Sequence, residues 1–188
     1  MNAPQPYSPT PSAVAFWLSL FDIDWYLAQN VDVARTGADP FDHFIQRGIT
    51  EGRSPTPLFN VRWYKHKYPD VVAAGASPLV HFMTQGAIEN RQPHPLFDMQ
   101  WYVRRYPGAA ASGINPLIHF VQYGASAGHQ PHPLFDTAWY VGQAMDHLEP
   151  QENPLAHFIR AGGLEGLSPH RLFDAAYYLK RYPDVEQA

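Results

Sequence analysis

Histidine offers the widest choice of chemistry in this sequence, because a neutral imidazole binds metal ions and titrates near neutral pH. The chain contains 10 histidines. Four of them each precede a phenylalanine and recur at intervals of 38 residues: His43, His81, His119 and His157. A second set has the same interval, with threonine at its first position: Thr56, His94, His132 and His170. The pattern indicates either ligands or bases, or one structural bond made repeatedly.

Metal binding by successive members of one set is excluded by distance. Packed helices lie about 8 to 10 Å apart, whereas zinc ligands lie about 2 Å from the ion. A site would need one histidine from each set together with a carboxylate such as Asp98, and no His-Glu-x-x-His spacing supports that alternative. We favour a bond from each repeated imidazole to a backbone carbonyl, or to the capping aspartate of an adjoining repeat, and predict no metal and no cofactor.

Catalysis needs one distinct set of residues, and repetition argues against it. The chain has no cysteine, no Gly-x-Ser-x-Gly motif and no glycine-rich phosphate loop after a strand. We therefore predict that the protein is not an enzyme and has no catalytic residue.

Phenylalanine, tryptophan, tyrosine and glycine follow the same interval of 38 residues without insertion or deletion. The pattern defines sequence repeats 1 to 4 (21–58, 59–96, 97–134 and 135–172), half repeat 5 (173–188) and a proline-rich tail and lead-in over 1–20. Periods of roughly 20 to 50 residues are typical of stacked units that cannot bury their apolar faces alone. We expect a single repeat domain over 21–188, with an unpaired face at each end that needs a cap or a partner.

Each repeat carries two helix signals. An Asp or Asn such as Asp98 precedes the Trp-Tyr pair and can cap a helix that a later Tyr-Pro interrupts. An Asn115-Pro116 type of pair then begins a second helix. We expect that helix to end in a left-handed glycine: Gly48, Gly86, Gly124 and Gly162. Because period-two alternation is absent, the sequence predicts an all-α solenoid of short helices with no sheet.

The tryptophan of each repeat has two interpretations. Adjacent residues on a helix point about 100° apart, so one member of a pair such as Trp101-Tyr102 can enter the core while the other seals the joint with the next repeat. The alternative is an exposed ladder that stacks sugar rings. The positions concerned are Trp25, Trp63, Trp101 and Trp139.

Repeat 4 departs from the pattern after its first helix, where residues 144–146 (Ala-Met-Asp) replace Tyr-Pro-Asp and several polar residues follow. The favoured interpretation is drift in a solvent-facing turn. A partner-specific contact is the alternative, and its candidate residues are Met145, His147, Glu149 and Glu152.

Composition narrows the class of protein. An apolar content of 45% indicates a folded chain, and a net charge of -4 argues against nucleic acid as a partner. The apolar run 13–20 is too short to span a bilayer and lacks the flanks of a signal peptide. We predict a cytoplasmic protein without a transmembrane segment, for which peripheral membrane association stays open. Residues 2–11 are expected to form a flexible tether or a segment that becomes ordered on a partner.

The stretches "FNVRWYKHKYPDVVAAGASPLVHFMTQGAIENRQPHPL" (59–96) and "ITEGRSPTPLF" (49–59) carry a resemblance. The chain resembles a bacterial 38-residue helical repeat that is found beside glycosyltransferase and surface-polysaccharide domains. The resemblance covers 21–188 and implies an accessory, non-enzymatic module. We predict a scaffold or adaptor that binds another protein, as an accessory module or subunit of a larger bacterial assembly. The alternative is a carbohydrate-binding module linked to surface polysaccharide synthesis.

Overall fold

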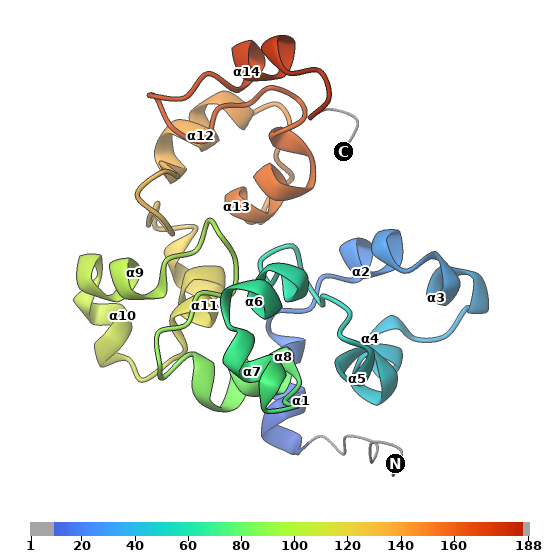
Figure 1. Ribbon diagram of the computed structural model, residues 1–188. Helices are drawn as coiled ribbons and strands as arrows, with labels where there is room; N and C mark the ends of the chain where they lie inside the picture. Colours follow the sequence, from blue (N-terminus) through green and yellow to red (C-terminus); the bar gives the residue numbers. More distant parts are fainter. Residues whose placement is uncertain (1–9, 186–188) are drawn as a thin grey trace. The chain divides into compact units, whose positions relative to one another are not determined.

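The computed structural model describes residues 10–185, and those residues are mainly helical (Figure 1). They contain no strand, although isolated bridge residues occur, such as the pair His132 and Phe135. The predicted all-α class is therefore confirmed.

The chain divides into two compact parts, residues 1–95 and 96–188. The first part contains α1 Pro11–Leu18, α2 Ile23–Gln29, α3 Val31–Thr36, α4 Pro40–His43, η1 Phe44–Gly48, α5 Ile49–Glu51, α6 Val61–Lys67, α7 Pro69–Ala73, α8 Pro78–His81 and η2 Phe82–Gly86. The second contains α9 Met99–Arg105, α10 Pro107–Ala111, α11 Pro116–His119, η3 Phe120–Gly124, α12 Thr137–Ala144, α13 Pro154–His157, η4 Phe158–Gly162 and α14 Ala175–Arg181.

The first helix of each repeat begins and ends as the sequence predicts. The Asp98 carboxylate accepts the Trp101 amide at 2.8 Å, and the same cap recurs at α2, α6, α12 and α14. Pro69 and Pro107 begin new short helices directly after Tyr68 and Tyr106. Repeat 4 lacks this proline, and α12 runs on to Ala144. Repeat 1 also lacks this proline, yet α2 ends at Gln29 and α3 begins at Val31, so the proline favours the break in repeats 2 and 3 but is not required for it.

The second helix of each repeat begins at its proline and changes into a π-helix after the histidine. The side chain of Asn115 accepts the Leu117 amide at 2.9 Å, whereas Ser77 makes no side-chain cap and donates to the Ile49 carbonyl at 3.2 Å. In η2 the Ala87 amide donates to the Phe82 carbonyl at 3.1 Å, five residues earlier. The π-helices η1 to η4 were not predicted.

The predicted left-handed conformation of the recurrent glycines is wrong. Gly48 has φ -55° and ψ -39°, and it lies in η1, not beyond a helix end. Positive φ values occur instead in two other columns at 38-residue spacing: Gly37, Gly75, Gly113 and Gln151, then Gly52, Asn90, Gly128 and Gly166. Left-handed residues therefore end the turn after the first helix and the turn after the π-helix, where the chain reverses.

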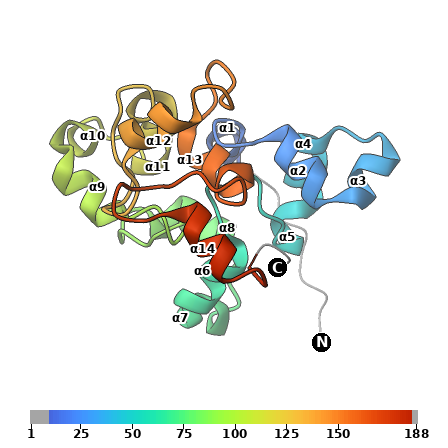
Figure 2. The same ribbon diagram turned by 90° about the horizontal axis from the view of Figure 1, so that it is seen from above.

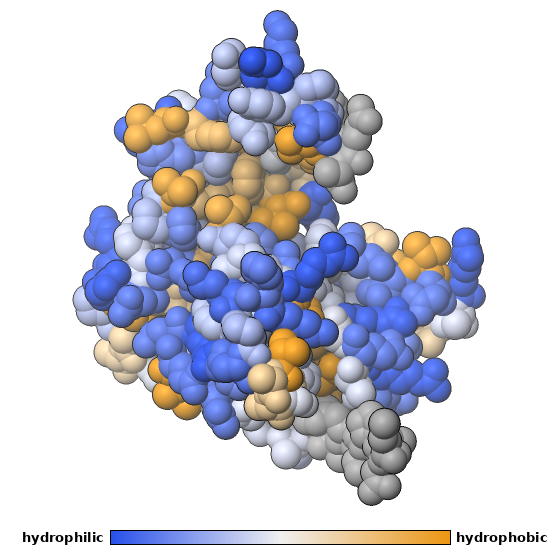
Figure 3. Space-filling model, viewed as in Figure 1, coloured by the Kyte–Doolittle hydropathy of each residue, from blue (hydrophilic) through white to orange (hydrophobic). Residues whose placement is uncertain are grey.

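The core of each part is built from the repeated aromatic residues. In the second part, α9 contacts both α10 and α11, and the three helices lie together in Figures 1 and 2. Phe97 lies 5.5 Å from Phe120 between ring centroids, and both are fully buried. On the face drawn in Figure 3, hydrophilic residues predominate and hydrophobic residues form separate patches.

Helix α1 was not predicted, because residues 1–20 were assigned to a tail and lead-in. Thr10 caps it, and Trp17 is fully buried with its ring 5.8 Å from Phe44 and 5.9 Å from Phe59. The segment thus covers apolar surface of repeats 1 and 2. The predicted tether over 2–11 falls mostly on residues 1–9, outside the described residues. Within 10–185 no helix has the length and apolar character needed to cross a membrane.

Candidate functional site

Each histidine of the first set is hydrogen-bonded to a tyrosine hydroxyl in its own repeat. The distances from Oη to Nδ1 are 2.9 Å for Tyr26–His43, 2.9 Å for Tyr64–His81, 3.0 Å for Tyr102–His119 and 2.5 Å for Tyr140–His157. All four tyrosines are fully buried, and burial raises the pKa of Tyr26 to about 12. The predicted partner, a carbonyl or a neighbouring capping aspartate, is therefore wrong. The first helix of the same repeat supplies the partner because it packs on the second.

The recurrent glycines Gly48, Gly86, Gly124 and Gly162 complete this cluster. A Cβ atom on Gly48 would lie 2.5 Å from the Tyr26 hydroxyl oxygen. A Cβ on Gly86 would also meet its tyrosine hydroxyl, that of Tyr64, and would lie 3.2 Å from His81 Nδ1. A glycine is therefore needed at this position, because the tyrosine hydroxyl occupies the space that a Cβ atom would take.

An arginine joins the end of repeats 1 and 2 to the turn after the first helix. Arg53 bonds Asp32 at 2.8 Å and Glu51 at 2.6 Å, and Arg91 lies 2.7 Å from Asp70. The hydrogen bond from the Arg53 guanidinium lowers the pKa of Asp32 to about 2. These exposed ion pairs join the turn after the first helix to the segment that follows the π-helix.

Repeat 3 has lost both partners of this ion pair, with Gly108 and His129 in their places. The His129 imidazole stacks on Tyr106 at 3.8 Å and 5°, as Arg91 lies over Tyr68 at 4.9 Å in repeat 2. In repeat 3 the His129 imidazole thus covers the tyrosine face that the Arg91 guanidinium covers in repeat 2.

The Tyr102 hydroxyl also lies 3.2 Å from His129 Nδ1, in addition to its bond with His119. Because a hydroxyl carries one proton, one imidazole accepts that proton and the other must donate its own to the oxygen. Burial, together with the nearby His119 and Arg105, lowers the pKa of His129. In repeat 3, Tyr102, His119 and His129 therefore form a cluster of three hydrogen-bonded side chains.

The second histidine set makes a local turn. Thr56 Oγ1 accepts the Leu58 amide at 3.3 Å, and the corresponding His132 Nδ1 accepts the Leu134 amide at 3.0 Å. His170 makes the same bond, which explains why threonine substitutes for histidine in repeat 1. His94 is buried, and desolvation lowers its pKa to about 4. Within residues 10–185, no group of three or more histidine or carboxylate side chains is arranged to hold a metal ion.

Tyrosine is the core member of each Trp-Tyr pair. Trp25, Trp63 and Trp101 are half-buried, and Trp139 is 41% exposed. The Arg171 guanidinium lies 5.9 Å from the Trp139 ring centroid, and the Lys67 ammonium lies 6.0 Å from that of Trp63. The tryptophans therefore lie at the surface edge of each repeat, and those of repeats 2 and 4 lie beside a cation.

The candidate contact residues of repeat 4 lie in and after its irregular turn. Met145 is 72% exposed, and His147 Nδ1 lies 3.4 Å from a carboxylate oxygen of Glu165. Glu152 forms an ion pair with Arg160 and accepts the Glu149 amide at 3.2 Å. The contacts of His147 and Glu152 thus stabilise this turn, and Met145 is its exposed apolar side chain.

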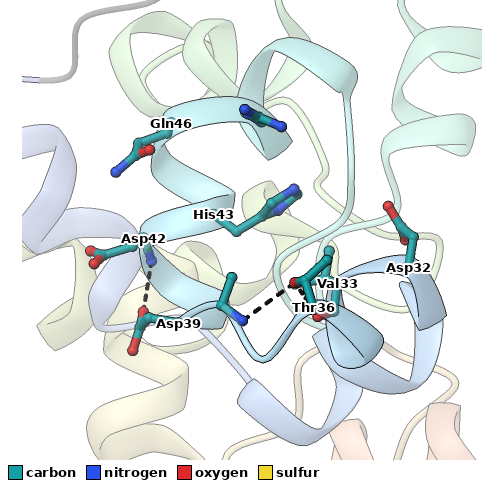
Figure 4. A pocket seen from close by; sticks show the side chains of 9 residues that line it. Asp32, Val33, Thr36, Asp39, Asp42, His43 and Gln46 are labelled. Carbon is teal, nitrogen blue, oxygen red and sulfur yellow. Dashed lines mark hydrogen bonds between the residues drawn. The ribbon is translucent and has the colours of Figure 1, made fainter.

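The groove drawn in Figure 4 lies between α3 and the α4–η1 helix and has a volume of about 530 Å³. Its labelled residues include Asp32, Asp39 and Asp42, and His43 extends from α4 toward the residues of α3 (Figure 4). Asp32 is bound to Arg53, Asp39 caps the Asp42 amide at 2.8 Å, and His43 is bound to Tyr26. The side chains of Asp32, Asp39 and His43 in this groove therefore make structural bonds.

Half repeat 5 differs from the full repeats in what it leaves exposed. Phe173 is 43% exposed and Tyr178 39%, whereas Phe97 and Tyr102 are fully buried at the corresponding positions. Val185 is 37% exposed, against 2% for Val71. We call Phe173, Tyr177, Tyr178, Tyr182 and Val185 the α14 face. The sequence predicted an unpaired end face, but none of these residues was singled out for it.

Comparison with protein-family models, with curated proteins and with solved structures found no match.

Proposed function

We propose that the chain is a non-catalytic helical-repeat scaffold that binds another protein. In this proposal, repeats 1 to 4 (21–172) stack as a solenoid and are followed by half repeat 5 (173–188). Support comes from bonds that recur at the repeat interval, such as those from the Asp22 amide to the Pro55 carbonyl and from the Asn60 amide to the Pro93 carbonyl, both 3.0 Å. Each bond ties the start of one repeat to its end.

The α14 face is the single observation that carries the binding proposal. Its rings are arranged as in a full repeat, since Phe173 lies 5.5 Å from Tyr178 and Tyr178 lies 4.9 Å from Tyr182. Preformed aromatic surface binds a partner at low entropic cost, because few side chains must be ordered on association. Contiguous exposed apolar patches are typical of interaction sites.

A carbohydrate-binding module is the second candidate, and the exposure of Trp139 beside Arg171 favours it. An aromatic ring and a guanidinium at one surface can stack on a sugar and donate to its hydroxyls. The resemblance to a repeat found beside glycosyltransferase domains supports either role, as an accessory module of a larger bacterial assembly.

Two variants separate these functions. A chain with Phe173→Ser and Tyr177→Ser is expected to lose retention of partner proteins and to keep its melting temperature, because both side chains are exposed. Trp139→Ala is the matched surface variant and is expected to retain them. Loss of polysaccharide-induced tryptophan fluorescence change in Trp139→Ala, with unchanged protein retention in the double variant, would instead establish the carbohydrate module.

A further inference from the structure

We propose that helix α6 and the groove beside it bind an acidic segment of another protein. In this interaction, carboxylates of the partner contact Arg62 and Lys65, and an apolar side chain next to them enters the groove. The surface belongs to repeats 1 and 2 and shares no residue with the α14 face, so the proposal stands whether or not that face binds a partner.

The exposed side of α6 carries basic residues that no acidic group neutralises. Arg62, Lys65 and His66 are exposed, and their spacing of three and four residues places them on one face of the helix. Among the residues that the structure describes, none forms an ion pair or a side-chain hydrogen bond with these three. The carboxylates of Glu51 and Asp70 are already bound to the arginines that end repeats 1 and 2. We call Arg62, Lys65 and His66 the α6 basic face.

These charges oppose the stability of their own helix. Arg62 lies in the first turn of α6, where the helix dipole favours a carboxylate, and repeat 1 has Asp24 at this position. Lys65 occupies a position that is leucine or valine in every other repeat, and like charges on adjacent turns repel. Residues that break a local rule and bind nothing within the chain are typical of functional surfaces.

A groove beside Lys65 supplies apolar surface. Its volume of about 420 Å³ lies within the range of about 300 to 1,000 Å³ that is typical of ligand pockets. Its lining comes from the end of repeat 1 and from α7 and α8, and includes Ile49, Val72 and Val80. Val72 is 50% exposed, and a Cβ atom on Gly52 would lie 3.4 Å from Lys65 Nζ. An apolar side chain in the groove therefore brings a neighbouring carboxylate close to the Lys65 ammonium.

A protein segment fits this surface better than a nucleic acid or an anionic polysaccharide. The chain has a net charge of -4 and the α6 basic face offers few cations, whereas binding of a polyanion depends on neutralising many charges. An acidic polysaccharide also has no aliphatic side chain for the groove. A peptide provides both groups, because an acidic residue and a leucine can be neighbours in its sequence.

The test uses capped peptides of the sequence Glu-Glu-X-Glu-Glu, in which X is Leu, Ile, Val or Phe. Each peptide is titrated at near-physiological salt into the isotope-labelled full chain while amide resonances are recorded. We expect at least one of them to cause saturable shifts, confined to residues 49–52, 61–67 and 72–80. Replacing X by alanine should weaken binding at least about threefold, because less apolar surface is buried. Replacing the four glutamates by glutamine should abolish it.

Two chain variants test the role of the charges. Arg62→Gln/Lys65→Leu introduces residues that other repeats have at these positions, as in Gln100 and Leu27. It should bind the best peptide at least about fivefold more weakly, because two ion pairs are lost, and should melt at the same or a higher temperature. Lys67→Gln is the matched control: Lys67 lies 6.0 Å from the Trp63 ring centroid, and its loss should change binding less than about twofold.

Four results would overturn the proposal. They are the absence of a saturable shift with all four peptides, equal binding of the alanine peptide, equal weakening by the two chain variants, and a lower melting temperature of Arg62→Gln/Lys65→Leu. A sulfated oligosaccharide that causes the same shifts at lower concentration would assign the surface to polyanions instead. Self-association that Arg62→Gln/Lys65→Leu abolishes would assign it to a second copy of this chain.

Discussion

The glycine beside each Tyr–His bond allows a prediction in which the sign of a stability change depends on a second residue. Gly86 has helical backbone geometry in η2, so alanine would ordinarily stabilise it by about 1 kcal/mol. Here the new Cβ would overlap the Tyr64 hydroxyl, and overpacking of this kind costs about 1 to 3 kcal/mol. Gly86→Ala should therefore lower the free energy of unfolding by roughly 1 kcal/mol in the wild-type background.

Tyr64→Phe removes the oxygen that the Cβ would meet and leaves His81 Nδ1 at 3.2 Å as the nearest remaining neighbour outside the Tyr64 ring. The tyrosine variant alone should cost about 1 to 3 kcal/mol, since the buried imidazole loses its partner. Adding Gly86→Ala to Tyr64→Phe should then be neutral or stabilising. Denaturant unfolding of the four proteins, followed by circular dichroism, measures this coupling.

Gly75→Ala provides the control. Gly75 has φ +68°, and a Cβ added to it would meet no atom within 4 Å, so its substitution should cost about 1 kcal/mol through backbone strain alone. That cost should be the same with Tyr64 or Phe at position 64. Equal destabilisation by Gly86→Ala in both backgrounds would contradict a steric overlap with the Tyr64 hydroxyl.

Three further predictions concern charge and metal. Because the folded pKa of Asp32 is lowered to about 2, its ion pair with Arg53 stabilises the fold above the unfolded pKa of 3.8 and is lost as the pH falls through 2; the melting difference between wild type and Arg53→Ala should shrink over that range and in high salt. The folded pKa of His94 is lowered from 6.5 to about 4, so the free energy of unfolding should be full above pH 6.5, decline as the pH falls from 6.5 to 4, and be lower by on the order of 3 kcal/mol below pH 4. His94→Gln should reduce this decline between pH 6.5 and 4. Stoichiometric zinc should leave the melting temperature of wild type and His81→Ala unchanged, and a rise that is specific to wild type would restore the metal hypothesis.

Local features of the fold could be predicted because they depend on residues close together in sequence. The Asp98 cap and the break before Pro107 follow from the backbone chemistry of those residues. The π-helices could not be predicted, because one additional residue in a turn leaves the apolar spacing nearly unchanged. The left-handed conformation was assigned to the wrong residue: Gly86 is the last residue of η2, and the positive φ of the following turn is at Asn90.

The candidate site depended on contacts that sequence alone does not define. The histidine positions indicated a repeated bond, but the partner lies 17 residues earlier on another helix, as in Tyr64–His81. The joint loss of aspartate and arginine in repeat 3 was visible as Gly108 and His129. Its structural consequence depends on tertiary contacts, because Arg91 and His129 lie on equivalent tyrosine rings.

The most direct measurement of the central claim is photo-crosslinking from the α14 face in living cells. A benzophenone amino acid replaces Tyr177, which is 67% exposed on that face, or Tyr123, which is 55% exposed on η3 and serves as the control. We predict a discrete protein adduct from position 177 that is absent from position 123 and is lost when Phe173→Ser is added. Identical adducts from both positions, or no protein adduct from position 177, would contradict it.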